Sequence, residues 1–184
     1  MQNQFDAQLG VDYGKVALVE HDERWEKTAD EVIELLWNIL GDVALDIQHT
    51  GSTSIRGIPA KPILDISVGV EDVSCAYHFR EPLQEHGIRI VGQLVPGQIM
   101  CDMKNTAEQE CVHIHFVRYN SAAWKEYILF RDYMNAFPEE ARHYAAVKTD
   151  LARRFQNNRK DYTAGKDTFI KEKIAEAYRW KNSR

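Results

Sequence analysis

The sequence has few cysteines and no long apolar run, the features that mark disulfide-rich and membrane-spanning proteins. It has an odd number of cysteines with no C-x-x-C spacing, so no disulfide framework is predicted and free thiols in a reducing cytoplasm are expected (Cys75, Cys101 and Cys111). No apolar run approaches the length of a membrane span, and the polar start MQNQFDAQLG does not resemble a signal peptide. We therefore expect a cytoplasmic protein with no membrane partner.

Motifs of several enzyme classes are missing as well. A P-loop is excluded because Arg56 stands where the second glycine of G-x-x-x-x-G-K-[ST] would follow Gly51. Neither a G-x-S-x-G elbow nor an H-E-x-x-H helix is present, and the single H-x-H lacks the second copy that a paired-histidine phosphoesterase needs. The net charge of −5 argues against a dedicated nucleic-acid binder, which usually presents a basic face.

At 184 residues and 44% hydrophobic content, the chain is long and apolar enough for one domain, or for one domain with a helical appendage. Strand-like alternation dominates up to residue 120, and helical spacing dominates from Ser121 onward. We therefore predict an α/β domain over residues 1–120, with residues 1–15 as a loose lead-in. A C-terminal helical segment over 121–184 is expected to pack on it.

The periodicity predicts an α+β fold, a mixed sheet of four or five strands with helices on one side. Asp22 is the expected N-cap of the first helix, Gly41 its C-terminal stop, and Asp161 the cap of the last. The predicted helices cover residues 23–40, 73–86 (irregular at Pro82), 122–136, 139–157 and 161–180. The predicted strands cover residues 43–47, 63–70, 88–95, 98–104 and 111–117, with a further short strand considered at 15–21 and a turn at Pro96-Gly97.

The stretch from His49 to Val70 carries the chemistry. Its Gly/Ser loop supplies small residues and backbone N–H groups that can form an anion nest. In the strand that follows, alternation places Asp65 on the face opposite a fully apolar one (Leu64, Ile66, Val68 and Val70). An ionised carboxylate there needs a partner. That partner is either a metal ion or, in a purely structural role, the cation of Lys61 or Arg56.

A histidine pair lies on a second predicted strand. Alternation over residues 111–117 directs His113 and His115 to one face and Val112, Ile114 and Phe116 to the other. Because both rings leave the same face, an H-x-H pair can ligate metal. We expect the pair to converge with Asp65 on one open face, where metal ligation and substrate contact are both open.

Two further residues flank the Gly/Ser loop. His49 is either a strand terminus, a phosphate contact or a residue that orients the loop. Lys61, in a loop bounded by prolines, is either solvent-exposed or a phosphate contact beside the anion nest.

These motifs resemble those of the GrpB family over roughly residues 15–175. The matching segments are HTGSTSIRGIPAKPILDISV, HIHFV, FRDYMNAFPEEARHY and a later pattern of Lys148, Tyr162 and Lys166. The Gly/Ser loop followed by a strand acid is also similar to the signature of the nucleotidyltransferase fold shared by DNA polymerase β and aminoglycoside nucleotidyltransferases. The resemblance implies a nucleotidyltransferase-like mixed sheet with flanking helices.

The resemblance also implies roles for individual residues. Gly51, Ser52 and Ser54 would hold the phosphates of a nucleoside triphosphate, and Asp65 would hold a divalent metal, Mg²⁺ or Mn²⁺. The cleft would be lined by nucleotide contacts from the other matching positions (His49, Lys61, Lys148, Tyr162 and Lys166).

The superfamily pattern is incomplete in this chain. Ser67 stands where the second acid of D-x-D is expected, and His113 and His115 stand near the position of the third. Imidazole suits Mn²⁺, Zn²⁺ or Fe²⁺ better than Mg²⁺, so a softer metal such as zinc becomes a candidate.

Two function hypotheses follow from these motifs. The first is a metal-dependent nucleotidyltransferase acting on an unknown acceptor, with Asp65, His113 and His115 as its catalytic and metal-binding residues. The alternative is a non-catalytic module of the same fold that senses a phosphorylated small molecule. Such a module could also assist a protein partner such as a dephospho-CoA kinase or a folding factor.

Overall fold

A five-stranded mixed sheet forms the centre of the molecule, which a computed structural model describes over residues 7–184. The strands are β1 (Asp46–Thr50), β2 (Leu64–Val70), β3 (Ile88–Gly92), β4 (Gln98–Lys104) and β5 (Glu110–Arg118). Their order is β1-β2-β5-β4-β3, and only the central pair β2 and β5 runs parallel. Of the predicted lead-in over 1–15, residues 1–6 lie outside the described part.

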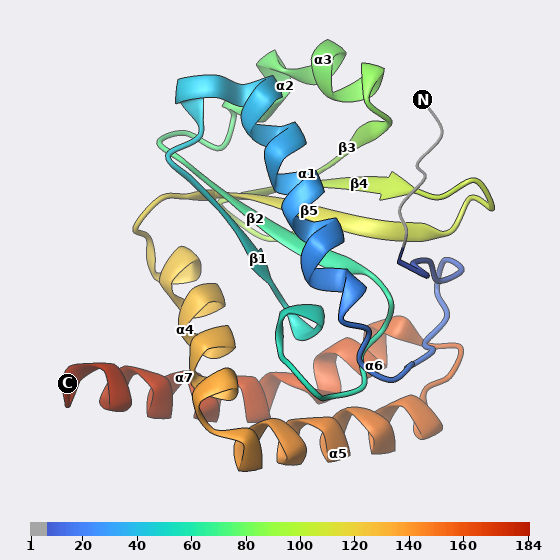
Figure 1. Cartoon of the computed structure of the whole chain (residues 1–184), viewed down its shortest axis with the longest axis vertical. Coiled ribbons are helices and arrows are strands. Elements are labelled where there is room, and N and C mark those ends of the chain that lie inside the picture. The colour runs from blue at the N-terminus through green and yellow to red at the C-terminus, as the bar shows by residue number, and fades with distance from the viewer. Residues whose placement is uncertain (1–6) are drawn as a thin grey trace.

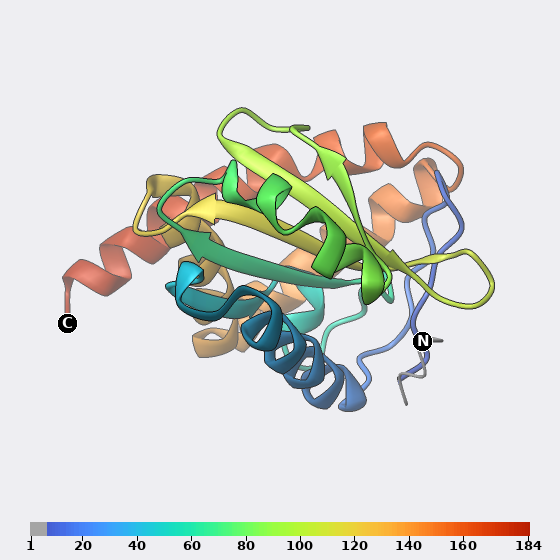
Figure 2. The same ribbon diagram turned by 90° about the horizontal axis from the view of Figure 1, so that it is seen from above.

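Helices cover both faces of this sheet rather than one, so the expected one-sided arrangement is wrong (Figures 1 and 2). One face carries α1 (Arg24–Leu40), α2 (Cys75–His78) and α3 (Arg80–Glu85). The other side carries α4 (Ala122–Ala136), α5 (Pro138–Arg154), α6 (Arg159–Gly165) and α7 (Asp167–Asn182). On this second face, α4 packs closely against β2. At Gly69 of β2, an added Cβ would lie 3.0 Å from the Trp124 ring of α4.

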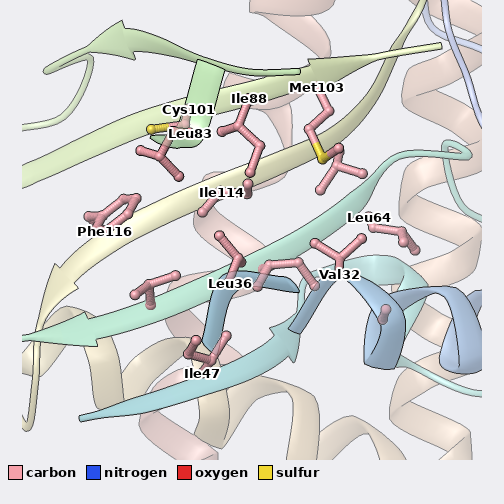
Figure 3. Close-up of a cluster of buried hydrophobic side chains, with 14 of the residues drawn as sticks. Val32, Leu36, Ile47, Leu64, Leu83, Ile88, Cys101, Met103, Ile114 and Phe116 are labelled. Carbon is pink, nitrogen blue, oxygen red and sulfur yellow. The ribbon is translucent and has the colours of Figure 1, made fainter. Parts of the chain in front are cut away.

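The main core lies between the sheet and α1, as the alternation predicts. The four apolar residues of β2 are fully buried (Leu64, Ile66, Val68 and Val70). They share one cluster with Val32 and Leu36 of α1 and with Ile114 and Phe116 of β5 (Figure 3). Asp65 is therefore directed to the opposite face. Among the described helices, none is both long and apolar enough to cross a membrane.

A second core fixes the loop between β1 and β2. Ile55 and Ile58 of this loop are buried in a cluster with Met134 of α4, Tyr144 of α5 and Ala177 of α7. Figure 1 shows the loop reaching down from the sheet towards α5 and α6. The Gly/Ser loop is thus anchored by helices that are distant in the sequence.

The first strand begins later than predicted. Val43 ends a short 3-10 turn, Gly41–Val43, and both Val43 and Leu45 are exposed. β1 starts at Asp46, which pairs with Gly69 next to the last residue of β2. Leu45 still donates its backbone N–H to Gly69 of β2, whereas Val43 belongs to the 3-10 turn, so the strand covers 46–50 and not 43–47.

Several other boundaries also differ. The helix predicted over 73–86 breaks at Phe79, while Pro82 lies in the first turn of α3, where its missing N–H is tolerated. The helix predicted over 161–180 is two helices, α6 and α7, and Asn158 rather than Asp161 caps the first of them.

The segments at the sheet margins are shorter than predicted. Residues 15–21 contribute one isolated bridge, from Val19 to Ala60, instead of a strand. β3 ends at Gly92 after a bulge, so it does not extend to residue 95. Leu94 and Val95 consequently lie exposed in the turn that leads into β4.

The anchoring of the loop can be tested by truncating Ile55. Ile55→Ala should destabilise the protein by about 2–5 kcal/mol, because it opens a cavity between the loop and the C-terminal helices. Leu94→Ala is the matched control, since Leu94 is 65% exposed and should change stability by no more than about 0.5 kcal/mol. Urea denaturation measures both. Equal stability of the two variants would show that the loop is not held by this contact.

Candidate functional site

The parallel pairing of β2 with β5 brings the predicted acid and histidines together. Asp65 is the register partner of His113, and Ser67 is the partner of His115. Asp65 Oδ1 lies 3.5 Å from His113 Nδ1 and 3.4 Å from His115 Nε2. One ligating atom from each residue lies within 4.8 Å of the others, which is close enough to hold a metal ion. The expected convergence on one sheet face is confirmed.

The Gly/Ser loop closes tightly over Asp65. Gly51 has a φ of +68°, and a Cβ at this position would lie only 2.2 Å from Asp65 Oδ2. Only glycine can make this approach without displacing the carboxylate. Beside it, Thr50 Oγ1 donates to the backbone oxygen of Asp65 and lies 2.9 Å from Ser67 Oγ. The buried Ser67 hydroxyl therefore packs against Thr50.

The charge of Asp65 is stabilised by the two imidazoles. Burial alone would raise the pKa of Asp65, but hydrogen bonds with His113 and His115 outweigh it and hold the pKa well below its usual range. Contacts with carboxylates have the opposite effect on the pKa of His113, which is raised. Burial would lower its pKa, whereas hydrogen bonds with Asp65 and Glu110 raise it. The structural alternative of a pair with Arg56 is not observed, because Arg56 pairs with Glu26.

Glu110 and Arg159 complete the site and were not predicted from the sequence. The Arg159 guanidinium donates to Glu110 Oε2, and its Nη2 lies 3.2 Å from His113 Nε2. Glu110 is buried, and its pKa falls to about 2, chiefly through hydrogen bonding with His113 and then with Arg159. His113 Nε2 lies 3.8 Å from Glu110 Oε2. The second ring nitrogen of His113 thus faces an acid and a cation.

A bulge in β5 explains why alternation along the sequence did not predict Glu110 as a site residue. Strict alternation places residue 110 on the face opposite residue 113. Met103 of β4 pairs with Val112, however, whereas Lys104 pairs with Glu110, so one residue of β5 is skipped. This bulge reverses the alternation and turns Glu110 towards His113.

A small basic pocket of about 190 Å³ lies beside the cluster of Asp65, His113 and His115. Ser52, Lys61, Tyr162 and Lys166 line it together with Asp65 (the other lining residues are Ile63, His113, Arg159 and Thr163). The ammonium groups of Lys61 and Lys166 lie 5.7 and 4.7 Å from the centre of the Tyr162 ring. Burial, followed by the nearby charges of Arg159 and Lys166, lowers the pKa of Lys61 to about 8. The pocket therefore concentrates positively charged side chains beside Asp65 and His113.

Lys148 lies under the loop rather than in this pocket. Its side chain is almost fully buried, and Nζ donates to the backbone oxygen of Pro59 at 2.6 Å. Nζ also lies 4.6 Å from the centre of the Tyr144 ring. Burial, followed by the charges of Lys166 and Lys61, lowers the pKa of Lys148 to about 7. In this arrangement Lys148 anchors the loop instead of reaching the pocket.

His49 and Ser54 lie on the other side of the loop. Both line a separate pocket of about 520 Å³, and Ile47 lines it as well. His49 Nε2 lies 2.9 Å from Thr53 Oγ1, and Ser54 Oγ donates to the backbone oxygen of Gly51. Burial lowers the pKa of His49 to about 4, which keeps the ring neutral. His49 therefore lies next to the end of β1 and contacts the loop through Thr53, outside the basic pocket.

Side chains of α4 and α5 hold the loop from the helical side. Tyr144 OH lies 3.3 Å from Ser52 Oγ. Asn135 donates to the backbone oxygen of Ser54 and accepts from the backbone N–H of Arg56. Arg131 bonds the neighbouring Asp132, and it also donates to the backbone oxygen of His49.

Comparison with known proteins identifies relatives along nearly the whole chain. The GrpB protein family model matches residues 15–176. A glutamate-rich protein GrpB of Alkalihalophilus pseudofirmus is 39% identical over 91% of this chain and 99% of its own length. A dephospho-CoA kinase of Mycolicibacterium paratuberculosis is 25% identical over 91% of this chain, which spans only 47% of that protein.

Solved structures agree with the sequence comparison. The crystal structure of conserved protein GrpB from Enterococcus faecalis superposes with a TM-score of 0.80 and 26% identity, covering 88% of this chain and 96% of that one. The Cid1 poly(U) polymerase in its MgGTP-bound structure gives a TM-score of 0.54 at 17% identity, covering 73% of this chain and 44% of that one. The second likeness shows that the fold is nucleotidyltransferase-like. The chain belongs to the GrpB family.

Proposed function

We propose that this protein binds a nucleoside triphosphate together with a divalent metal and transfers a nucleotidyl group to an acceptor. One observation carries the proposal: Asp65, His113 and His115 present ligating atoms within 4.8 Å of one another, directly beside a basic pocket. The Gly/Ser loop borders the same cluster through Gly51. Metal and phosphate positions that adjoin in this way are what nucleotidyl transfer requires.

The donor set favours a borderline metal over magnesium. One carboxylate and two imidazoles suit Mn²⁺, Fe²⁺ or Zn²⁺, whereas Mg²⁺ prefers an all-oxygen environment. The low pKa of Asp65 keeps its carboxylate ionised and ready to ligate. When bound, the cation would neutralise the charge that develops on the transferring phosphate.

The protein's own groups would bind and orient the substrate. Lys61, Lys166 and the Gly51–Ser52 turn would hold the phosphates in the basic pocket. An acceptor hydroxyl would attack the α-phosphorus as pyrophosphate leaves. Its proton would pass to an imidazole of the pair that does not ligate the cation at that moment, because a ligating imidazole has no free lone pair; histidine suits this role near neutral pH. His115 is the more exposed of the two, with 21% of its side chain accessible against 7% for His113.

A second candidate function is a non-catalytic module that binds a phosphorylated ligand. The observation in its favour is Ser67, a buried hydroxyl at the position of the expected second acid. The similarity to part of a dephospho-CoA kinase supports an accessory role beside a partner domain. Product formation in an unbiased screen of nucleotides with Mn²⁺ separates the two functions, because the module would bind without turnover.

Asp65→Asn tests the metal role of the carboxylate. The wild type with Mn²⁺ and a nucleoside triphosphate at 100 times its dissociation constant should gain about 2.7 kcal/mol of stability. Asp65→Asn should lose most of this gain, because an amide does not hold the cation. The exposed Asp42→Asn is the charge-matched control and should keep the gain in full. Thermal melts measure the difference. An undiminished ligand shift in Asp65→Asn would remove this residue from the site.

The histidines should make metal binding pH-dependent. A ligating imidazole must be deprotonated, so affinity is lost as the pH falls through the pKa of His113. Because that pKa is raised, the loss should begin above the ordinary value of about 6.5. Calorimetric titrations with Mn²⁺ or Zn²⁺ between about pH 5.5 and 8 measure it.

Variants decide whether the histidine pair is responsible. A His113→Ala, His115→Ala double variant should bind neither metal, whereas the surface control His143→Ala should behave like the wild type (its side chain is 69% exposed). Unchanged affinity in the double variant would mean that the pair is not part of a ligand set.

A further inference from the structure

The basic pocket is too small to enclose a whole nucleotide. Its volume is about 190 Å³, whereas sites that enclose a drug-sized ligand measure about 300–1,000 Å³. A water molecule takes up about 30 Å³ in the liquid, so the pocket has room for a handful of water-sized groups. A short chain of phosphates fits this space, and the sugar and base of a nucleotide then lie outside it.

Among the described residues, three lysine or arginine side chains and one carboxylate line this small volume. Lys61, Arg159 and Lys166 contribute the basic groups, and Asp65 contributes the acid. Lysine presents a point charge to a phosphate, whereas arginine presents two parallel hydrogen-bond donors. All of these contacts address phosphate oxygens, which are the same whichever nucleoside the chain carries.

No aromatic ring in the described lining of the pocket is open for a base to stack on. Tyr162 is 1% exposed, and the ammonium groups of Lys61 and Lys166 lie 5.7 and 4.7 Å from the centre of its ring. The other lining ring is that of His113, which is buried and contacts Asp65. Proteins that bind single bases commonly stack them on aromatic planes, and this pocket provides no such surface.

The pocket also lacks groups that distinguish the edges of bases. Asparagine and glutamine, whose amides pair with base edges, are absent from its described lining. Ser52 and Thr163 supply only hydroxyls, which both donate and accept hydrogen bonds and therefore do not distinguish one base from another. The lining carboxylate is that of Asp65, and it faces the two histidines of the cluster. The lining residues therefore offer contacts to phosphate and none that select a base.

We propose that the site recognises the phosphate chain of its substrate and does not select the base. This inference rests on the proposed function and deepens it. It defines the ligand class as molecules that carry a terminal diphosphate or triphosphate, with the remainder of the molecule outside the pocket. Nucleoside triphosphates of all the common bases belong to this class, and so does inorganic tripolyphosphate.

Affinities of the wild-type protein provide the most direct test. ATP, GTP, CTP, UTP and inorganic tripolyphosphate are each titrated calorimetrically at one fixed concentration of free Mn²⁺. The four nucleotides should bind within about threefold of one another, which is less than the roughly five- to 150-fold that a stacked base contributes. Tripolyphosphate should bind at least as tightly as ATP, because it carries the same phosphates. A preference above about fivefold for one nucleotide, or for ATP over tripolyphosphate, would overturn the inference.

Two matched variants show whether these ligands bind in the pocket or on basic surface in general. Lys166→Met should weaken every ligand by at least about tenfold and leave the ratios among them unchanged, because it removes a charged donor to phosphate. Lys160→Met is the control. Lys160 is exposed on α6 and does not line the pocket, so its loss should change each affinity by about twofold or less. Equal losses in the two variants would indicate attraction to surface charge and contradict the inference.

The outcomes also separate this inference from the proposed function. If one nucleotide binds far more tightly than the others, only the inference fails. If none of the nucleotides and no tripolyphosphate binds, the proposed function fails and the inference fails with it. Equal binding without turnover supports the inference together with the non-catalytic module, because both candidate functions use the same pocket. The wild-type titrations need no variant, so they decide the question even if a substitution unfolds the protein.

Discussion

The parallel pairing of β2 with β5 is the constraint on which the site depends. It sets Asp65 opposite His113 in the centre of the sheet, two positions along the strands from the pair of Ser67 and His115. A shift of β5 by one residue against β2 would turn His113 and His115 into the apolar core and Ile114 out of it. Burial of the opposite face therefore fixes the geometry of the cluster. The sheet places a carboxylate and two imidazoles close together before any ligand arrives.

The C-terminal helices make the second contribution. They fix the Gly/Ser loop through Ile55 and Ile58, and through hydrogen bonds from Asn135 and Tyr144. They also supply Arg159, Tyr162 and Lys166 to the pocket. The sheet by itself brings Asp65, His113 and His115 together. The basic pocket, in contrast, forms only where the C-terminal helical segment packs against the loop. The two parts of the candidate site, the acid and histidine cluster of the sheet and the basic pocket, therefore come from different parts of the chain and adjoin in the fold.

The sequence was sufficient for those parts of the site that follow from local alternation. Apolar residues at every second position of β2 and β5 predicted that Asp65, His113 and His115 share a face. The prediction failed where alternation was interrupted or misplaced. The bulge in β5 concealed Glu110. Because the first strand was predicted to end at residue 47, no sheet face was predicted for His49. Continued alternation would have placed His49 with Ile47 on the face that packs against α1.

Tertiary packing determined the remaining differences. Lys148 lies on α5 and Lys166 in the turn between α6 and α7, yet one anchors the loop at Pro59 and the other enters the pocket. Spacing along the chain does not distinguish these positions, because the difference arises from how α5 and α6 cross the loop. Arg159 was missed for a related reason. It begins a helix that was predicted to start at Asp161, so it was read as part of a connection between helices.

A crystal structure with bound Mn²⁺ and a nucleoside triphosphate analogue tests the central claim most directly. Diffraction data collected at the manganese absorption edge locate the metal independently of any assumption about the site. The account predicts an anomalous peak within bonding distance of Asp65, His113 and His115, with the phosphates extending towards Lys61 and Lys166. A peak elsewhere, or an unchanged set of hydrogen bonds among these three residues at saturating Mn²⁺ and nucleotide, would contradict it.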